Sequence, residues 1–177
     1  MERRYGARVE WRTFDLHPEY PPEGIPREVL RRRYPPGVAD SVFDMIEEAG
    51  LPVDRGLEHV PNARKSLVLT ELADEQGRAG EFIEAAFAAY WAERRDIGDD
   101  DVLLDLARTA GLDEHDARAE LTEQQRLDRV HHNTAEVTDL GAGGVPAWVI
   151  DRRVLIPGAQ PHDVFERVLE KLGHRPV

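Results

Sequence analysis

The sequence predicts an α/β fold with a helical insertion, and three observations lead to this prediction. Residues 7–16 alternate between apolar and polar side chains, which is typical of a β-strand. Residues 38–110 repeat apolar side chains at helical spacing. Residues 145–156 return to strand-like runs before a last helix. The order strand, helical block, strand, strand, helix is that of an α/β domain interrupted by helices.

The strand predicted at residues 7–16 places Val9 and Trp11 on one face, and His17-Pro18 ends it. Residues 18–37 that follow are rich in proline. Proline fixes φ and lacks a backbone donor, so it interrupts both helices and sheets. This segment is therefore predicted to be a constrained loop with at most one short helix, at 26–34.

Helices are predicted throughout residues 38–139. Gly50 with Pro52 ends the first, Asn62 is a plausible N-cap of the second, and Asp99 can cap a later one. The last stretch is longer and more polar than the others. The predicted helices cover residues 38–49, 62–76, 82–91, 99–110 and 113–139.

The final third of the chain predicts a β-hairpin followed by a helix. Val145–Ile150 is a continuous apolar run, which suits a strand buried on both faces. Asp151–Arg153 makes a tight turn into the second strand, Val154–Ile156. Gly158–Pro161 then opens the last helix, whose apolar residues recur as a buried stripe.

The composition excludes several classes of function. The chain has 177 residues and a net charge of −12, which disfavours duplex nucleic acid and anionic membranes as partners. It contains no cysteine, which excludes disulfides, thiolate catalysis and cysteine-based metal sites within these residues. No run approaches the roughly 20 apolar residues of a membrane span, so we expect a cytoplasmic protein.

Two groups of residues that could suggest a nucleotide site or a metal site do not fit either one. The glycine run Gly141–Gly144 precedes a strand, whereas a nucleotide loop follows one. Asp128, His131 and His132 lie within reach of one another on a helix, but the spacing places no further ligand beside them. We expect a solvated helix face there, and no metal site.

Val145-Pro146 is the remaining candidate for binding. A proline at the entrance of a strand lacks the ladder N–H, and either a cis peptide or an ordinary trans proline at the first strand position satisfies that constraint. A cis proline at a sheet edge would leave the backbone of the preceding residue able to pair with an extended ligand. The spacing leaves the two alternatives open.

The residues around this proline resemble a known family. Gly144–Ile150 (GVPAWVI) followed by Val154–Gln160 (VLIPGAQ) resembles the carboxy-terminal signature of the DsbA-like thioredoxin-fold proteins, particularly their FrnE-like branch. Ala88–Asp99 resembles the helical insertion of that branch, and Phe14–Pro18 resembles its early segment. Relatives of the family include 2-hydroxychromene-2-carboxylate isomerases and kappa-class glutathione transferases.

The resemblance implies a thioredoxin-like fold of the DsbA type with an all-helical insertion. Residues 1–18 and 140–177 would form the thioredoxin-like sheet and the C-terminal helix. Residues 19–139 would form a linker and the insertion. The activity implied is thiol–disulfide exchange or glutathione-dependent chemistry.

The resemblance also implies a substrate-binding site. Pro146 would be the cis-proline that faces the active site, and the backbone of Val145 would bond a thiol or peptide-like substrate. Gly158, Ala159 and Gln160 would occupy the turn that helps to hold glutathione in the transferase branch, with Ala and Gln in place of its polar and acidic members. No cofactor is expected, glutathione is left open, and so is a homodimer.

The departure from the family lies at the start of the chain. Glu2–Gly6 resembles the end of the helix that carries Cys-x-x-Cys, so we expect the sheet to be incomplete and expect no catalytic residue here. A start codon assigned too late, a degraded gene and a strand supplied by a partner would each explain this, and we favour the first. The function expected is a DsbA/FrnE-like oxidoreductase that is inactive as this chain stands. A glutathione-dependent isomerase or transferase, and a non-catalytic interaction protein completed by a partner strand, are the alternatives.

Overall fold

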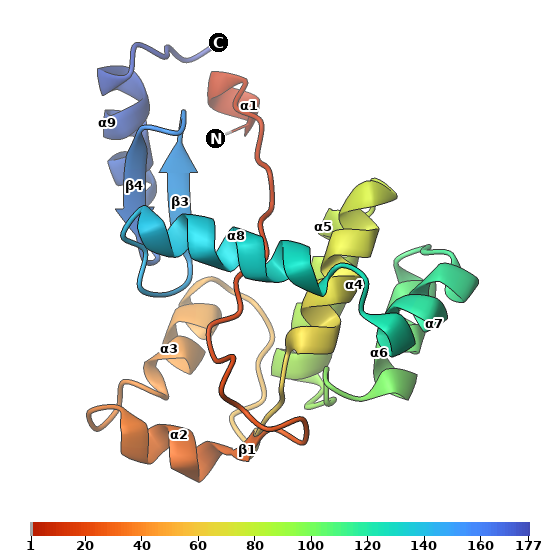
Figure 1. Ribbon diagram of the computed structural model, residues 1–177. Helices are drawn as coiled ribbons and strands as arrows, with labels where there is room; N and C mark the ends of the chain where they lie inside the picture. Colours follow the sequence, from red (N-terminus) through yellow and green to blue (C-terminus); the bar gives the residue numbers. More distant parts are fainter. Residues whose placement is uncertain (1) are drawn as a thin grey trace. The chain divides into compact units, whose positions relative to one another are not determined.

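A computed structural model describes residues Glu2–Val177. The chain folds into two compact units, which Figure 1 draws in one view. The first unit consists of the residues up to Leu16 together with His131–Val177, and the second of His17–Val130. The domain limits expected from the sequence stay a prediction. Within the described residues, no helix combines the length and the apolar character that crossing a bilayer requires.

A β-hairpin and a helix form the centre of the first unit. Strand β3 (Ala147–Ile150) pairs antiparallel with β4 (Val154–Pro157), which confirms the predicted hairpin. Asp151 and Arg152 turn the chain with φ values of +52° and +55°, the sign that the favoured two-residue hairpin turns require. Helix α9 (His162–Lys171) follows β4 and is drawn beside the hairpin in Figure 1.

The strand predicted at 7–16 is wrong, because residues 6–15 belong to neither a helix nor a strand. A strand requires a neighbour with which to exchange backbone hydrogen bonds, and the described residues of this unit pair only β3 with β4. Side chains of two residues much later in the chain, Asn133 and Thr134, hold the segment instead. Asn133 donates to the hydroxyl of Thr13 over 3.1 Å, and the Asp15 amide donates to the Thr134 hydroxyl over 2.9 Å.

Strand β3 is also less buried than the sequence predicts. The apolar run suggested a strand covered on both faces, but 40% of Val149 is exposed and its neighbours are half-buried. The reason is that a two-stranded sheet needs two covering layers to bury both faces. Trp148 points to α9, where its ring meets Phe165 edge to face at a centroid distance of 5.3 Å.

Helix α1 (Glu2–Tyr5) packs against α9 within the same unit. Arg4 forms an ion pair with Glu166, and the Arg4 carbonyl accepts the amide of Val177 over 2.8 Å. Tyr5 is buried, and this burial together with the carboxylates of α9 raises the pKa of its phenol. Helix α1 therefore contacts both α9 and the C-terminal residue Val177.

Four helices enclose the core of the second unit. They are α4 (Arg64–Glu75), α5 (Ala79–Phe87), α6 (Asp100–Thr109) and α7 (Glu114–Glu123). Their buried faces carry apolar residues that recur at helical spacing, including Leu69, Leu72, Phe82, Leu103 and Leu106. Residues at spacings of three and four lie on one side of a helix, which is why the pattern gave this core correctly.

The helix ends confirm one predicted cap and correct one predicted boundary. The Asp99 carboxylate accepts the amides of Asp101 and Val102, both over 3.0 Å, so the predicted cap of α6 is confirmed. The stretch predicted as helix from 113 to 139 is instead broken by Gln124, whose φ is +47°. Helix α8 (Leu127–Asp139) begins after that break.

The segment from His17 to Val60 forms the remaining part of the second unit. Helix α2 (Arg27–Arg33) lies within the range predicted for one short helix, and α3 (Ser41–Glu48) follows it. A two-residue ladder of β1 (Ile25–Pro26) and β2 (His59–Val60), which the sequence did not predict, closes this segment. Helix α5 continues as a π-helical turn, η1 (Ala88–Ala92).

Buried Arg27 joins these pieces. Its guanidinium lies 4.4 Å from the centre of the Phe43 ring and donates to the Ala39 carbonyl over 2.7 Å. The Asp40 carboxylate lies 3.4 Å from its Nε atom. Burial of a cation is costly unless it is paired, so these contacts fix α2 against α3.

Candidate functional site

Val145 and Pro146 lie at the entrance of β3, as the sequence predicted. The peptide bond between them is cis. The side chain and backbone of Val145 are 54% exposed, and Pro146 is exposed as well. A ligand that approaches this end of the hairpin would therefore meet Val145 first.

The structure brings the second predicted stretch to the same place. The amide of Gly158 donates to the carbonyl of Pro146 over 2.7 Å, because Ala147 and Pro157 are partners in the β3–β4 register. Gly158 leaves β4 with a φ of +75°, a conformation that a glycine adopts without strain. Thus the five residues singled out in the sequence, Val145, Pro146, Gly158, Ala159 and Gln160, form one contiguous patch.

Two hydrogen-bond donors of the turn before α9 are used within the protein. The Gly158 amide is used by Pro146, and the Gln160 side-chain amide donates to the Pro157 carbonyl over 2.9 Å. Pro161, at the N-cap, has no amide hydrogen. Asp163 already supplies a negative charge to the first turn of α9. A ligand carboxylate that bound to the Gly158 amide or to this Gln160 N–H would have to displace its internal partner.

None of the five patch residues is ionisable. The patch can therefore bind through backbone groups and apolar contact, but it cannot supply a nucleophile or a general acid or base. Strand β3 uses one edge for β4, and no other strand among the described residues pairs with it. An unpaired edge presents a row of backbone donors and acceptors to an extended chain.

The hairpin beneath the patch is held by aromatic packing. Trp148 and Phe165 meet edge to face, and Ile156 of β4 is buried. The indole N–H of Trp148 is buried and finds no acceptor among the described residues. The position of the patch thus depends on shape and apolar contact between β3 and α9.

The sequence did not predict which residues hold the segment 6–15 in place. Asn133 is buried and bonds Thr13, yet it lies in a polar helical stretch where an asparagine is expected to be solvated. Only its distant partner reveals the role, so no local signal could have found it. His131 and His132, beside it, are exposed, and in the part of the chain that the structure covers no group of three or more His, Asp or Glu has metal-binding geometry.

Comparison with known proteins gives one family. The family model described as "DSBA-like thioredoxin domain" matches residues 1–170. The chain is 29% identical over 165 residues to the "Uncharacterized protein YwbO" of Bacillus subtilis (strain 168), a match that covers 91% of this chain and 80% of that protein.

A solved structure is similar over the same extent. It is a "probable DsbA oxidoreductase" from Streptomyces coelicolor, with a TM-score of 0.81 and 29% sequence identity. The superposition covers 90% of this chain and 73% of the Streptomyces chain.

Proposed function

Because the chain belongs to the DSBA-like thioredoxin domain family, we propose that it is a DsbA-like protein of the thiol–disulfide oxidoreductase class that binds substrate and, as this chain stands, does not carry out the exchange. The observation that carries the proposal is the exposed Val145-Pro146 entrance to β3, which lies beside an edge without a partner strand among the described residues. The substrate class that fits this patch is an extended, peptide-like chain.

The exchange reaction itself needs a cysteine that these residues do not contain. In thiol–disulfide exchange a thiolate attacks one sulfur of a disulfide, a new S–S bond forms, and the other sulfur leaves as a thiolate. The sequence of 177 residues has no cysteine, so neither sulfur can come from it. The proposed role of these residues is to position the substrate backbone.

Two measurements test this function on the chain as it exists. With dithiothreitol as reductant, the chain should not accelerate insulin reduction above the reductant alone. Reduced and alkylated insulin B chain should nevertheless shift the amide NMR signals of Val145 and of β3. Turnover of insulin, or shifts that leave β3 untouched, would contradict the proposal.

A matched pair of variants distinguishes specific binding at the patch from nonspecific binding to exposed apolar side chains. Val145→Asp places a charge at the patch and should weaken binding of the B chain by about tenfold, the change produced by about 1.4 kcal/mol. Val38→Asp is the control, because Val38 is similarly exposed and lies in the other unit. Equal loss in both variants would contradict a site at Val145.

The glutathione-dependent alternative finds less support in the geometry. Two donors that could receive a glutathione carboxylate, the Gly158 amide and one N–H of the Gln160 side chain, are already used within the protein. We therefore expect millimolar glutathione to leave the amide signals of Gly158–Gln160 unshifted. A saturable shift there would favour the isomerase or transferase reading.

The free edge of β3 favours one further candidate, an interaction protein whose sheet is completed by a second chain. Residues 6–15 form no ladder with β3, so this edge has no partner strand among the described residues, and an unpaired edge can template pairing with another chain. Light scattering tests this candidate together with the homodimer. A monomeric mass over a range of concentrations, with no added partner bound, would count against strand donation.

A cytoplasmic location is part of the same proposal. A chain without cysteine gains nothing from an oxidising compartment, which supports but does not require this location. Cell fractionation followed by detection of the protein in the cytosolic fraction tests it.

A further inference from the structure

A cavity of about 430 Å³ opens on the second unit, whereas the five-residue patch belongs to the first. Tyr20, Pro21, Ile25 and Val29 supply its apolar lining, from the loop before β1, from β1 and from α2. Arg32, Arg33 and Glu19 line the rest of it. The cavity lies in the volume range of roughly 300–1,000 Å³ that is usual for small-molecule sites.

The loop that forms one wall is fixed in place. The Asn62 side-chain amide donates to the carbonyls of Tyr20, over 2.8 Å, and Pro21, over 3.3 Å. The amide of Gly24 closes the loop by donating to Pro21 over 2.8 Å. The Tyr20 ring stacks on His17 with a centroid distance of 4.3 Å. A wall held in this way costs a ligand little ordering free energy.

The cavity is less acidic than the chain as a whole. Two arginines and one glutamate line it, and together with Glu28, the ion-pair partner of Arg32, their charges sum to zero, whereas the chain carries −12. Arg33 Nη1 lies 2.5 Å from Glu19 Oε1, but a guanidinium has five N–H donors, so this pair leaves others for a second acceptor. The remaining N–H donors of the two guanidinium groups can therefore receive an added anion.

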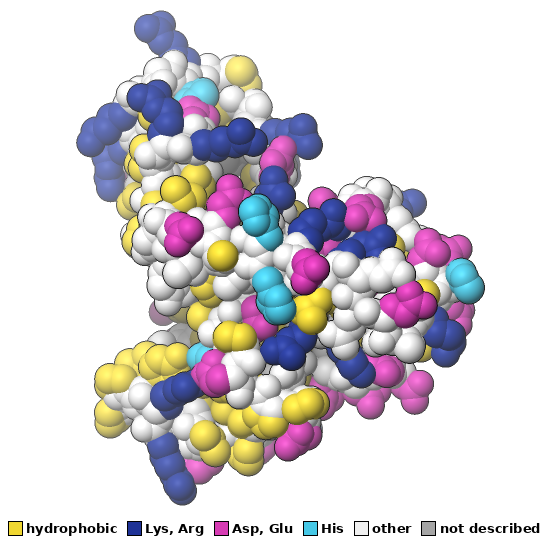
Figure 2. Space-filling view, viewed as in Figure 1, with side chains coloured by type: hydrophobic (Ala, Val, Ile, Leu, Met, Phe, Trp, Pro, Cys, Tyr) yellow, Lys and Arg dark blue, Asp and Glu magenta, His cyan; other side chains and the backbone are white. Residues whose placement is uncertain are grey.

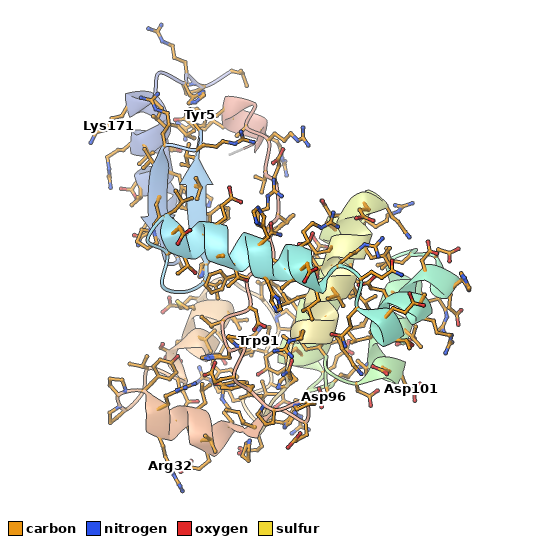
Figure 3. The ribbon with its side chains drawn as sticks, viewed as in Figure 1. Tyr5, Arg32, Trp91, Asp96, Asp101 and Lys171 are labelled. Atoms are coloured by element: carbon orange, nitrogen blue, oxygen red, sulfur yellow. The ribbon has the colours of Figure 1, made fainter. Side chains whose placement is uncertain are left out.

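Arg32 is the more available of the two arginines. Its side chain is 76% exposed and extends from α2 toward solvent in Figure 3. Its one ion pair within the described residues is with Glu28, 3.1 Å away and one helical turn earlier. Exposed pairs at this spacing stabilise a helix by only about 0.3–0.5 kcal/mol, so a ligand anion can replace Glu28 at small cost.

From these observations we propose that the cavity binds a small organic carboxylate with an apolar body. The carboxylate pairs with Arg32 and Arg33, and the apolar body lies on Tyr20, Ile25 and Val29. Figure 2 shows hydrophobic side chains gathered over α2 and α3, and Val29 and Tyr34 are among the exposed ones. A ligand with both parts uses the apolar surface and the cationic rim together.

The sign of the charge can be tested with two probes that share one body. In amide NMR of the whole chain, 4-phenylbutyrate should give saturable shifts centred on residues 19–33. The amine analogue 4-phenylbutylamine and plain acetate should give smaller shifts, because the first lacks the anion and the second lacks the body. Equal binding of the amine, or shifts centred elsewhere, would overturn the proposal.

Two variants test the arginine that pairs with the carboxylate and the apolar residue that contacts the ligand body. Arg32→Gln should weaken 4-phenylbutyrate binding about threefold or more, within the range expected of an exposed ion pair. Arg118→Gln is its control, because Arg118 is also an exposed helical arginine paired one turn away, with Glu114 at 3.0 Å. Val29→Asp should abolish binding, and Val38→Asp should not. Unchanged affinity in Arg32→Gln, or equal loss in Arg118→Gln, rejects the site.

Discussion

At the scale of single residues, Gly24 shows how backbone geometry and close contact add up. Its φ is +72°, and a Cβ there would lie 2.4 Å from the Val60 carbonyl oxygen of β2. Gly37 has a similar φ of +84° but nothing within 4 Å of the added atom. We expect Gly37→Ala to cost about 1 kcal/mol of stability and Gly24→Ala at least about 2 kcal/mol more, because only the second must also open the β1–β2 ladder.

Urea unfolding of the two variants measures this difference directly. The slope of the transition should stay constant, since neither change alters the surface exposed on unfolding. Equal destabilisation of the two variants would mean that the contact of Gly24 with Val60 contributes nothing.

Trp148 gives a second prediction at the residue scale. Its ring packs on Phe165, while its buried N–H has no acceptor among the described residues. Trp148→Phe keeps an aromatic ring and removes an unsatisfied donor, so we expect a change within about 1 kcal/mol. Trp148→Ala should cost about 3 kcal/mol through the space it leaves. Thermal unfolding checks both, and a large loss in Trp148→Phe would show that the N–H has a partner after all.

At the scale of elements, a group of charges joins the start of α8 to α4 and α7. Arg126 pairs with Glu120 of α7 and lies 2.5 Å from Glu75 of α4, and Arg129 lies 2.7 Å from the same Glu75. The Glu120 side chain is only 1% exposed. Removing its cation leaves the buried carboxylate with the Arg126 backbone amide but no charged partner, so Arg126→Met should cost about 3 kcal/mol. Arg118→Met, which breaks an exposed pair on α7, should cost no more than about 1 kcal/mol.

The same group predicts a pH dependence. Arg126, and after it Arg129, holds the pKa of the Glu75 carboxyl below its usual range. A carboxyl whose pKa is lowered by folding stabilises the folded state above its unfolded pKa, which is about 4.3. That contribution disappears as the pH falls through the folded pKa. The stability gap between the wild type and Arg126→Met should therefore narrow between pH 7 and pH 3, and a gap that widens would contradict the pairing.

At the scale of the whole molecule, the two units differ in how much apolar surface they bury. The fully buried hydrophobic residues of the second unit form a continuous core over α4–α7, whereas those of the first are few, chiefly Tyr5, Ala142, Ile156 and Leu169. Local stability follows buried contact. In native-state hydrogen exchange, amides of α4 and α6 should be the most protected and those of β3 and β4 should exchange earlier. Equal protection in both units would show that they unfold only together.

The sequence predicted most elements because their signals are local. Helical spacing predicted the helices that carry the core residues Leu69, Phe82 and Leu103, and an aspartate before a helix predicted the cap at Asp99. The hairpin of β3 and β4 followed from two apolar runs around a short turn. Each of these signals lies within a few residues of the structure it specifies.

Local patterns gave wrong predictions where the structure depends on residues beyond those that form the pattern. Alternation at residues 7–16 is compatible with a strand, but a strand forms only beside another, and none lies there among the described residues. The break at Gln124 goes with the Arg126 amide, which donates to the buried Glu120 carboxylate over 2.9 Å and begins α8 on a new axis. Neither partner is visible in the segment itself.

What the sequence determined alone is the class of fold, the positions of most helices, and the absence of any thiol from these 177 residues. Only the tertiary structure brought Val145-Pro146 beside Gly158, left one edge of β3 unpaired among the described residues, and set Arg32 and Arg33 at the rim of an apolar cavity. The physical reason is the separation along the chain of the residues that interact. Periodicity and capping act between residues one to four positions apart, whereas edges, cavities and buried charges depend on residues that only folding brings together.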